Sequence, residues 1–242
     1  MLAAHTAGGR TVGDALAAAK TAGLIQASDR GLCVTRSTAG AWMTEYRDAS
    51  RNCRFYMGVM FEHVYQRTQV PVGCASCFKV KVVPRSLREL MAVREVAHAL
   101  PHTYKCGLDE ASRYTSGIYG CYFYLIGLDG ARAAFPGIRQ AVSDHPALGP
   151  DVAVFIKRGC TEYEIHCGPS DQYTFRPEQK ALEGALLSAL EMPVQQSSTS
   201  AEVMRAFAAW IETAYRLGDE TYLDFTGGRR LFPAVVRYSP EA

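Results

Sequence analysis

The sequence has no apolar run long enough to cross a lipid bilayer. Its longest apolar stretch, residues 118–128, contains glycines and falls far short of the roughly 20 residues that a membrane helix needs. Residues 1–26 also lack the cationic segment followed by an apolar stretch that is typical of a signal peptide. We therefore expect a cytoplasmic protein that has no membrane partner.

Neither sign of charge dominates the chain. Lys and Arg together number 26 and Asp and Glu 24, which gives a formal net charge of +2. A net charge this small provides no overall affinity for polyanions. Any nucleic-acid surface must therefore be local.

Several motifs of catalysis and phosphate binding are missing. No Gly-x-Ser-x-Gly elbow is present, so hydrolysis by a serine nucleophile has no support. The Gly-rich segments 8–13 and 227–230 lack a preceding strand and the spacing of a phosphate-binding loop. The catalytic residues, if there are any, and the small-molecule substrate are therefore unknown from the sequence.

The middle of the chain alternates between two hydrophobic periods. Period-2 segments predict strands, and segments with apolar residues every three or four positions predict helices. The resulting order is β-α-β-β-α-β, which is typical of the α+β split βαβ (ferredoxin-like) fold, a four-stranded antiparallel sheet with two helices on one face and strand order 4-1-3-2. The expected elements are strand 78–83, helix 86–100, strand 102–106, strand 119–126, helix 129–143 and strand 152–165.

The sequence predicts a helical extension on each side of this core. Residues 1–70 form the N-terminal extension, in which an apolar residue every three or four positions predicts a long helix over 41–68. Residues 71–170 form the core, and residues 171–242 provide C-terminal helices and a tail. Amphipathic patterns place the C-terminal helices at 177–192 and 201–217.

Four of the eight cysteines are expected to converge. Cys74 and Cys77 immediately precede the first strand, Cys106 ends the second, and Cys160 lies late in the fourth. In the split βαβ topology these positions share one edge of the sheet. Because the cytosol keeps thiols reduced, a thiolate-ligated metal centre is favoured over disulfides.

The identity of this centre is open at this point. An iron–sulfur cluster tolerates dispersed ligands and favours a protected pocket, zinc requires four ligands near 2.3 Å, and a site without metal is the third possibility. Cys167 is an alternative fourth ligand, but strand alternation favours Cys160. A metal-free thiol enzyme, with Cys74 as nucleophile and Cys77 as its resolving partner, is a further alternative.

The other cysteines have apolar surroundings in the sequence. Cys53 lies on the apolar stripe of the expected long helix, and Cys33 and Cys121 lie among apolar residues. All three are interpreted as buried, inert thiols.

Two local basic surfaces support an alternative function. One lies on the expected long helix and the other on the first strand of the core, and single-stranded RNA is a plausible ligand for such a sheet face. The residues are Arg47, Arg51, Arg54, Lys79 and Lys81. The sequence thus favours an iron–sulfur protein that serves electron transfer or cofactor handling among other protein subunits, with a zinc-stabilised RNA-binding subunit of a ribonucleoprotein as the alternative.

Overall fold

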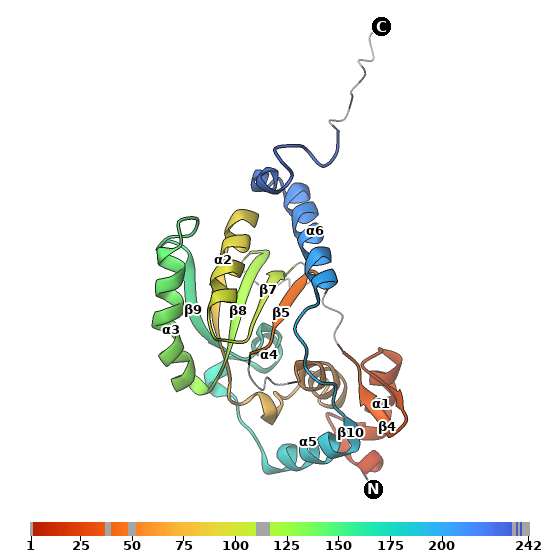
Figure 1. Ribbon diagram of the computed structural model, residues 1–242. Helices are drawn as coiled ribbons and strands as arrows, with labels where there is room; N and C mark the ends of the chain where they lie inside the picture. Colours follow the sequence, from red (N-terminus) through yellow and green to blue (C-terminus); the bar gives the residue numbers. More distant parts are fainter. Residues whose placement is uncertain are drawn as a thin grey trace.

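The computed structural model describes residues 2–36, 40–47, 52–109, 117–233, 236 and 238. It is a mixed α+β structure with several sheets (Figure 1). The largest sheet is antiparallel and has five strands in the order β5-β7-β8-β6-β9, one more than the four expected. These strands are β5 (Trp42–Glu45), β6 (Cys77–Val83), β7 (Tyr104–Leu108), β8 (Tyr119–Ile126) and β9 (Ala153–Arg158).

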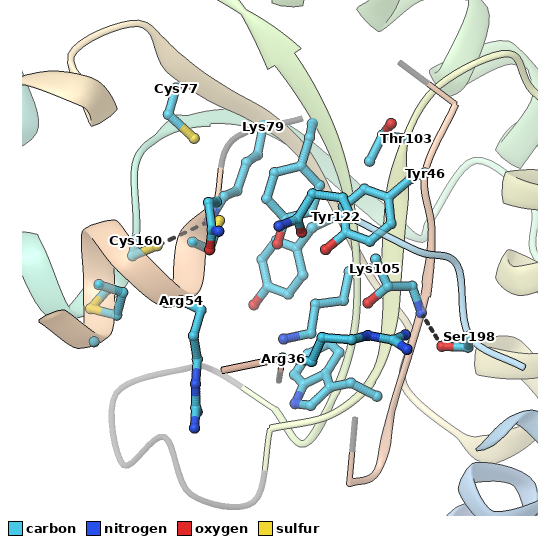
Figure 2. Close-up of a pocket in the computed structure, with 18 of the residues that line it drawn as sticks. Arg36, Tyr46, Arg54, Cys77, Lys79, Thr103, Lys105, Tyr122, Cys160 and Ser198 are labelled. Carbon is cyan, nitrogen blue, oxygen red and sulfur yellow. Dashed lines mark hydrogen bonds between the residues drawn. The ribbon is translucent and has the colours of Figure 1, made fainter. Parts of the chain in front are cut away.

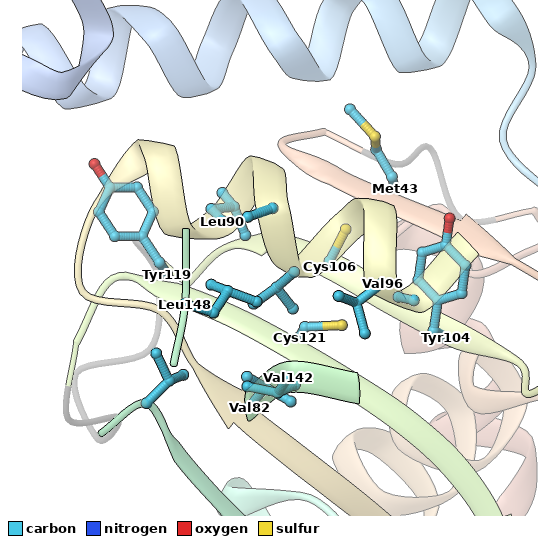
Figure 3. Close-up of a cluster of buried hydrophobic side chains, with 14 of the residues drawn as sticks. Met43, Val82, Leu90, Val96, Tyr104, Cys106, Tyr119, Cys121, Val142 and Leu148 are labelled. Carbon is cyan, nitrogen blue, oxygen red and sulfur yellow. The ribbon is translucent and has the colours of Figure 1, made fainter. Parts of the chain in front are cut away.

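Three helices pack on one face of this sheet: α2 (Leu87–Ala99), α3 (Gly127–Asp144) and α6 (Ser200–Leu217) (Figure 1). The Ser86 side chain caps α2 by accepting a hydrogen bond from the Glu89 N–H, as the sequence pattern predicts. The buried side chains between helices and sheet form the main core (Figure 3).

Alternation along β6 divides its side chains between the two faces of the sheet. Val80 and Val82 enter the main core, whereas Cys77 and Lys79 line a cavity on the opposite face. Because successive side chains of a strand point to opposite faces, this division fixes which residues can meet.

Segments far apart in the sequence build a second, smaller core. α1 (Val12–Thr21) and the π-helix η2 (Arg54–Val64) pack with α5 (Pro177–Ala189). A three-stranded sheet, ordered β10-β4-β3, adjoins them. The remaining elements are η1 (Leu2–Ala4), β1 (Thr6–Ala7), β2 (Arg10–Thr11), β3 (Ile25–Ser28), β4 (Gly31–Val34), η3 (Val72–Cys74), α4 (Thr161–Cys167), η4 (Ser170–Gln172), β10 (Leu190–Glu191) and η5 (Glu220–Phe225).

The long helix expected over 41–68 is wrong in its first part. Residues Trp42–Glu45 instead form β5, which pairs with β7 through the register Trp42↔Gly107 to Glu45↔Tyr104. The apolar spacing of this segment is compatible with a helix or a strand. The strand forms because it pairs with the edge of β7. Among the described residues of this segment, helical structure begins at Cys53 and continues into η2.

The strand expected over 152–165 is also shorter than predicted. β9 ends at Arg158, Gly159 has a φ of 63°, and Cys160 caps α4. A glycine with positive φ turns the chain at no steric cost. The alternation argument that preferred Cys160 over Cys167 therefore does not apply, because both residues lie beyond the strand.

The described residues contain no helix long and apolar enough to cross a membrane.

Candidate thiol site and adjoining cavity

Three of the four cysteines predicted to converge lie in one cluster. Cys74 and Cys77 are 7% and 5% exposed, and Cys160 packs against the apolar group that contains them. Cys74 Sγ and the Tyr163 hydroxyl are hydrogen-bonded at 3.4 Å. Lys79 Nζ donates to Cys160 Sγ at 3.3 Å. The β9–α4 turn and the η3–β6 turn thus bring these thiols together.

Cys106 does not join them. It pairs with Cys121 across β7 and β8, and both thiols are fully buried in the main core, on the helix-covered face (Figure 3). Burial raises the pKa of Cys121 well above its usual value. The register pairs Cys106 with Cys121 and Cys121 with Val82, five residues along β6 from Cys77. The sequence argument therefore missed both the end of the sheet and the face, because it ended the strand at Cys106, whereas β7 continues to Leu108, and did not consider which way the side chain alternates.

Cys53 takes a place near the cluster that the sequence did not predict. It precedes the first residue of η2 and lines the same cavity as Cys77 and Cys160. Cys53 is exposed, so the expectation of a buried thiol is wrong. Desolvation by the protein atoms around it, together with the nearby Cys160 and Cys77 thiols, raises the pKa of Cys53 to about 11. No short spacing motif links Cys53 to the other cysteines, so only the tertiary structure reveals it.

The four thiols influence one another electrostatically. Burial raises the pKa of Cys74 well above its usual value, and the Cys160, Cys77 and Cys53 thiols raise it further. Reactive nucleophilic cysteines show the opposite direction, a depressed pKa. The described site therefore gives no support to Cys74 as a free thiolate nucleophile, and a positive centre among the thiols would offset their mutual repulsion.

Lys79 is the cation nearest to this group. Burial lowers its pKa, but the charges of Cys160, Tyr124, Cys77 and Cys53 outweigh that effect and raise the pKa well above its usual value. Its side chain is 5% exposed and lies between the thiols and the rest of the cavity (Figure 2).

Two charged side chains, the buried Glu183 and the partly buried Arg158, hold the loop that carries Cys74 and Cys77. Glu183, 3% exposed, accepts hydrogen bonds from the Val72 N–H at 2.7 Å and the Gly73 N–H at 2.8 Å. On the other side, Arg158 donates two hydrogen bonds to the Ala75 carbonyl, at 2.8 and 3.1 Å. The backbone of this loop is thus fixed at both ends.

Cys167, the alternative fourth ligand, packs against the same apolar group as Cys160. It lies at the end of α4, and its Sγ donates to the Arg67 carbonyl at 3.5 Å. It is partly buried, and like Cys74 it does not line the cavity that Cys53, Cys77 and Cys160 share.

The cavity has a volume of about 570 Å³ and lies between the sheet and η2. Its floor is the face of the sheet that carries Lys79, Lys105 and Tyr122. Residues 193–196 and Ser198 line another side. Figure 2 shows Cys77 and Cys160 on one side of this space, and Tyr46, Lys105 and Ser198 on the other.

The basic residues of the RNA alternative do not form a shared open surface. Lys79 and Lys81 are 5% and 6% exposed. Arg47 forms an ion pair with Glu45. Arg54 donates hydrogen bonds to the Gly23 carbonyl and to Thr35, and Arg51 lies outside the described residues.

Within the described part of the chain, no group of three or more His, Cys, Asp or Glu side chains is placed so that it could hold a metal ion. Comparisons with protein-family models, with curated proteins and with solved structures found no match to this chain. Inferences about function therefore rest on the site itself.

Proposed function

We propose that Cys53, Cys74, Cys77 and Cys160 bind an iron–sulfur cluster, and that the protein serves electron transfer or cofactor handling among other cytoplasmic subunits. The observation that carries this proposal is the packing of Cys74, Cys77 and Cys160 in one apolar group, with Cys53 lining the same cavity as Cys77 and Cys160. Relative to the sequence prediction, Cys53 replaces Cys106, which faces the opposite side of the sheet.

The separate origins of the thiols favour a cluster over a single zinc ion. The thiols come from the start of η2, from the turn between η3 and β6, and from the turn between β9 and α4. In a cluster with several irons, different thiolates bind different irons, so ligands from separate segments suit it.

The surroundings suit a cluster as well. Phe61 and Tyr163 pack beside Cys74 and Cys77 with ring centroids 4.6 Å apart, which would shelter the centre from water. Lys79 donates to Cys160, and hydrogen bonds to sulfur are among the features that set the reduction potential of a cluster. A cationic neighbour also stabilises the negative charge of thiolate ligands.

For the fold, we propose that four of the five strands are a split βαβ (ferredoxin-like) unit. The strand order β9-β6-β8-β7 supports this assignment, since it corresponds to 4-1-3-2 in chain order. β5 would then be an added edge strand, which brings Trp42 and Thr44 to the cavity.

The test is iron and acid-labile sulfide analysis, with an absorption spectrum, on protein purified without oxygen. We expect brown protein, and we expect Cys53→Ser, Cys74→Ser, Cys77→Ser and Cys160→Ser each to lose most of the iron. Cys33→Ser is the matched control, because Cys33 lies on β4 in the smaller sheet. Cys106→Ala distinguishes the ligand set proposed here from the set expected from the sequence, because only the latter includes Cys106.

Two results would contradict the proposal. Colourless protein with one bound zinc would favour the zinc-stabilised RNA-binding alternative. Iron lost in Cys106→Ala but retained in Cys53→Ser, with both variants folded by circular dichroism, would reject Cys53 as a ligand.

A further inference from the structure

The part of the cavity away from Cys77 and Cys160 contains cations with few hydrogen-bond acceptors. Lys105 Nζ lies 4.6 Å from the centroid of the Trp42 ring. Within the described residues it makes no hydrogen bond or ion pair with protein. Lys79 packs on Tyr122 and Tyr124 at 5.6 and 5.1 Å, and its one hydrogen bond in the described residues goes to the Cys160 sulfur. A bound anion would supply the missing acceptors.

Of the three described carboxylates that line the cavity, two accept hydrogen bonds from protein groups. Asp109 accepts a hydrogen bond from the Tyr122 hydroxyl at 3.4 Å. Glu202 accepts from the Thr199 N–H and hydroxyl at the start of α6. Glu162 is the third carboxylate that lines the cavity. Cations outnumber the carboxylates, because Arg36, Arg54 and Lys157 line the cavity in addition to Lys79 and Lys105.

Aromatic rings border the same region. The Trp42 and Tyr122 rings are 5.8 Å apart and inclined by 45°, and Tyr46 also lines the cavity (Figure 2). Aromatic side chains of this kind provide stacking surfaces for a planar ligand.

The enclosure favours a small molecule over a nucleic-acid strand. Residues 197–198 join the free edge of β5: the Ser198 N–H donates to the Thr44 carbonyl at 2.8 Å, and the Thr44 N–H donates to Ser198 Oγ at 3.0 Å. Residues 193–198 thereby run along one side of the space, whereas single-strand binders present a groove that follows the backbone. The volume, about 570 Å³, is within the range of small-molecule pockets.

From these contacts we infer that the Lys105 side of the cavity binds a small molecule that carries a planar ring and an anionic group. The ring packs against Trp42 and Tyr122, and the carboxylate or phosphate accepts hydrogen bonds from Lys105. This inference goes beyond the proposed function and does not depend on what the thiols hold.

Isothermal titration calorimetry on the full chain tests it, with benzoate, phenyl phosphate, neutral benzyl alcohol and inorganic phosphate as probes. We expect the two aromatic anions to bind and the neutral alcohol to bind at least about tenfold more weakly, since a charge-assisted hydrogen bond is worth about 1.5–3 kcal/mol. Inorganic phosphate, which lacks the ring, is expected to bind more weakly than phenyl phosphate.

Variants locate the site. Lys105→Met is expected to weaken binding of benzoate about tenfold or more, Lys105→Arg to retain most of it, and Trp42→Leu to weaken it. Lys180→Met, which removes an exposed charge on α5, is the matched control and is expected to bind as the wild type does.

Several outcomes would overturn the inference. These are no binding of either aromatic anion, equal binding of benzoate and benzyl alcohol, or unchanged affinity in folded Lys105→Met. Tighter binding of an oligouridylate that displaces benzoate would assign the face to nucleic acid instead. The comparison of charged and neutral probes needs only the wild-type protein. It therefore tests whether the cavity prefers an aromatic anion even if a variant does not fold. Iron content measured on the same samples separates this result from the outcome for the thiol site.

Discussion

Glu183 offers the sharpest test of how the thiol loop is held. Its Oε1 accepts hydrogen bonds from the Val72 N–H at 2.7 Å and the Tyr65 hydroxyl at 3.0 Å, and its Oε2 accepts from the Gly73 N–H at 2.8 Å. In Glu183→Gln, the oxygen can keep two of these bonds while the amide NH₂ faces the remaining donor. One buried donor then lacks an acceptor.

The expected loss of stability in Glu183→Gln follows from that single lost acceptor. A buried donor without a partner costs about 1–3 kcal/mol, and a chain of this size changes its Tm by about 2–4 °C per kcal/mol. We therefore expect Glu183→Gln to unfold several degrees below the wild type. Because Val72 and Gly73 lead directly to Cys74, we also expect less iron per chain after anaerobic purification.

The assay is thermal unfolding by circular dichroism at pH 8, with iron analysis on the same samples. Burial raises the pKa of Glu183, although the Gly73 and Val72 N–H groups act in the opposite direction, so an alkaline pH keeps the wild-type carboxylate ionised. Glu178→Gln, an exposed substitution in the first turn of the same helix, is the control. Equal Tm values and equal iron contents for the two variants would refute the reasoning.

Two further substitutions test packing and pH dependence. Gly73→Ala would place a Cβ 2.1 Å from the Tyr56 ring, so urea unfolding should show a loss of about 1–3 kcal/mol, whereas Gly130→Ala, in open space on α3, should lose nothing. Burial raises the pKa of Asp219, but its hydrogen bonds outweigh this and lower the pKa below 3.8. Its stabilising effect is therefore present above pH 3.8 and lost as the pH falls through the lowered pKa. Asp219→Asn should be less stable than wild type at pH 7, with a difference that shrinks in acid; a constant difference would contradict this.

The sequence predicted much of the central sheet and its helices. Alternation in β6, the Ser86 cap of α2 and the apolar stripe of α6 are local signals, and the structure contains these elements close to their expected positions. β5 was missed because a four-residue strand has too few residues to separate its period from that of a helix. Its pairing partner, β7, lies about 60 residues further along the chain.

The candidate site was predicted only in part. Cys74 and Cys77 share a short motif, and Cys160 follows a glycine that turns the chain, so sequence spacing could place them at one edge. Cys106 was assigned to the same edge, although the register places it level with Val82 rather than Cys77 and its side chain faces the main core. Cys53 could not be found in this way, because its position depends on how η2 packs against the sheet.

The smaller core has a consequence for the order in which the chain folds. It joins Val12 and Phe55 to Leu182 and Leu186, and β10 pairs in parallel with β4 through Leu190↔Leu32. Contacts so distant in sequence form slowly, because a long loop must close first. During synthesis the first helix therefore remains without its full complement of apolar neighbours until α5 has left the ribosome. Truncation before that helix would leave an apolar surface for chaperones or proteases to recognise.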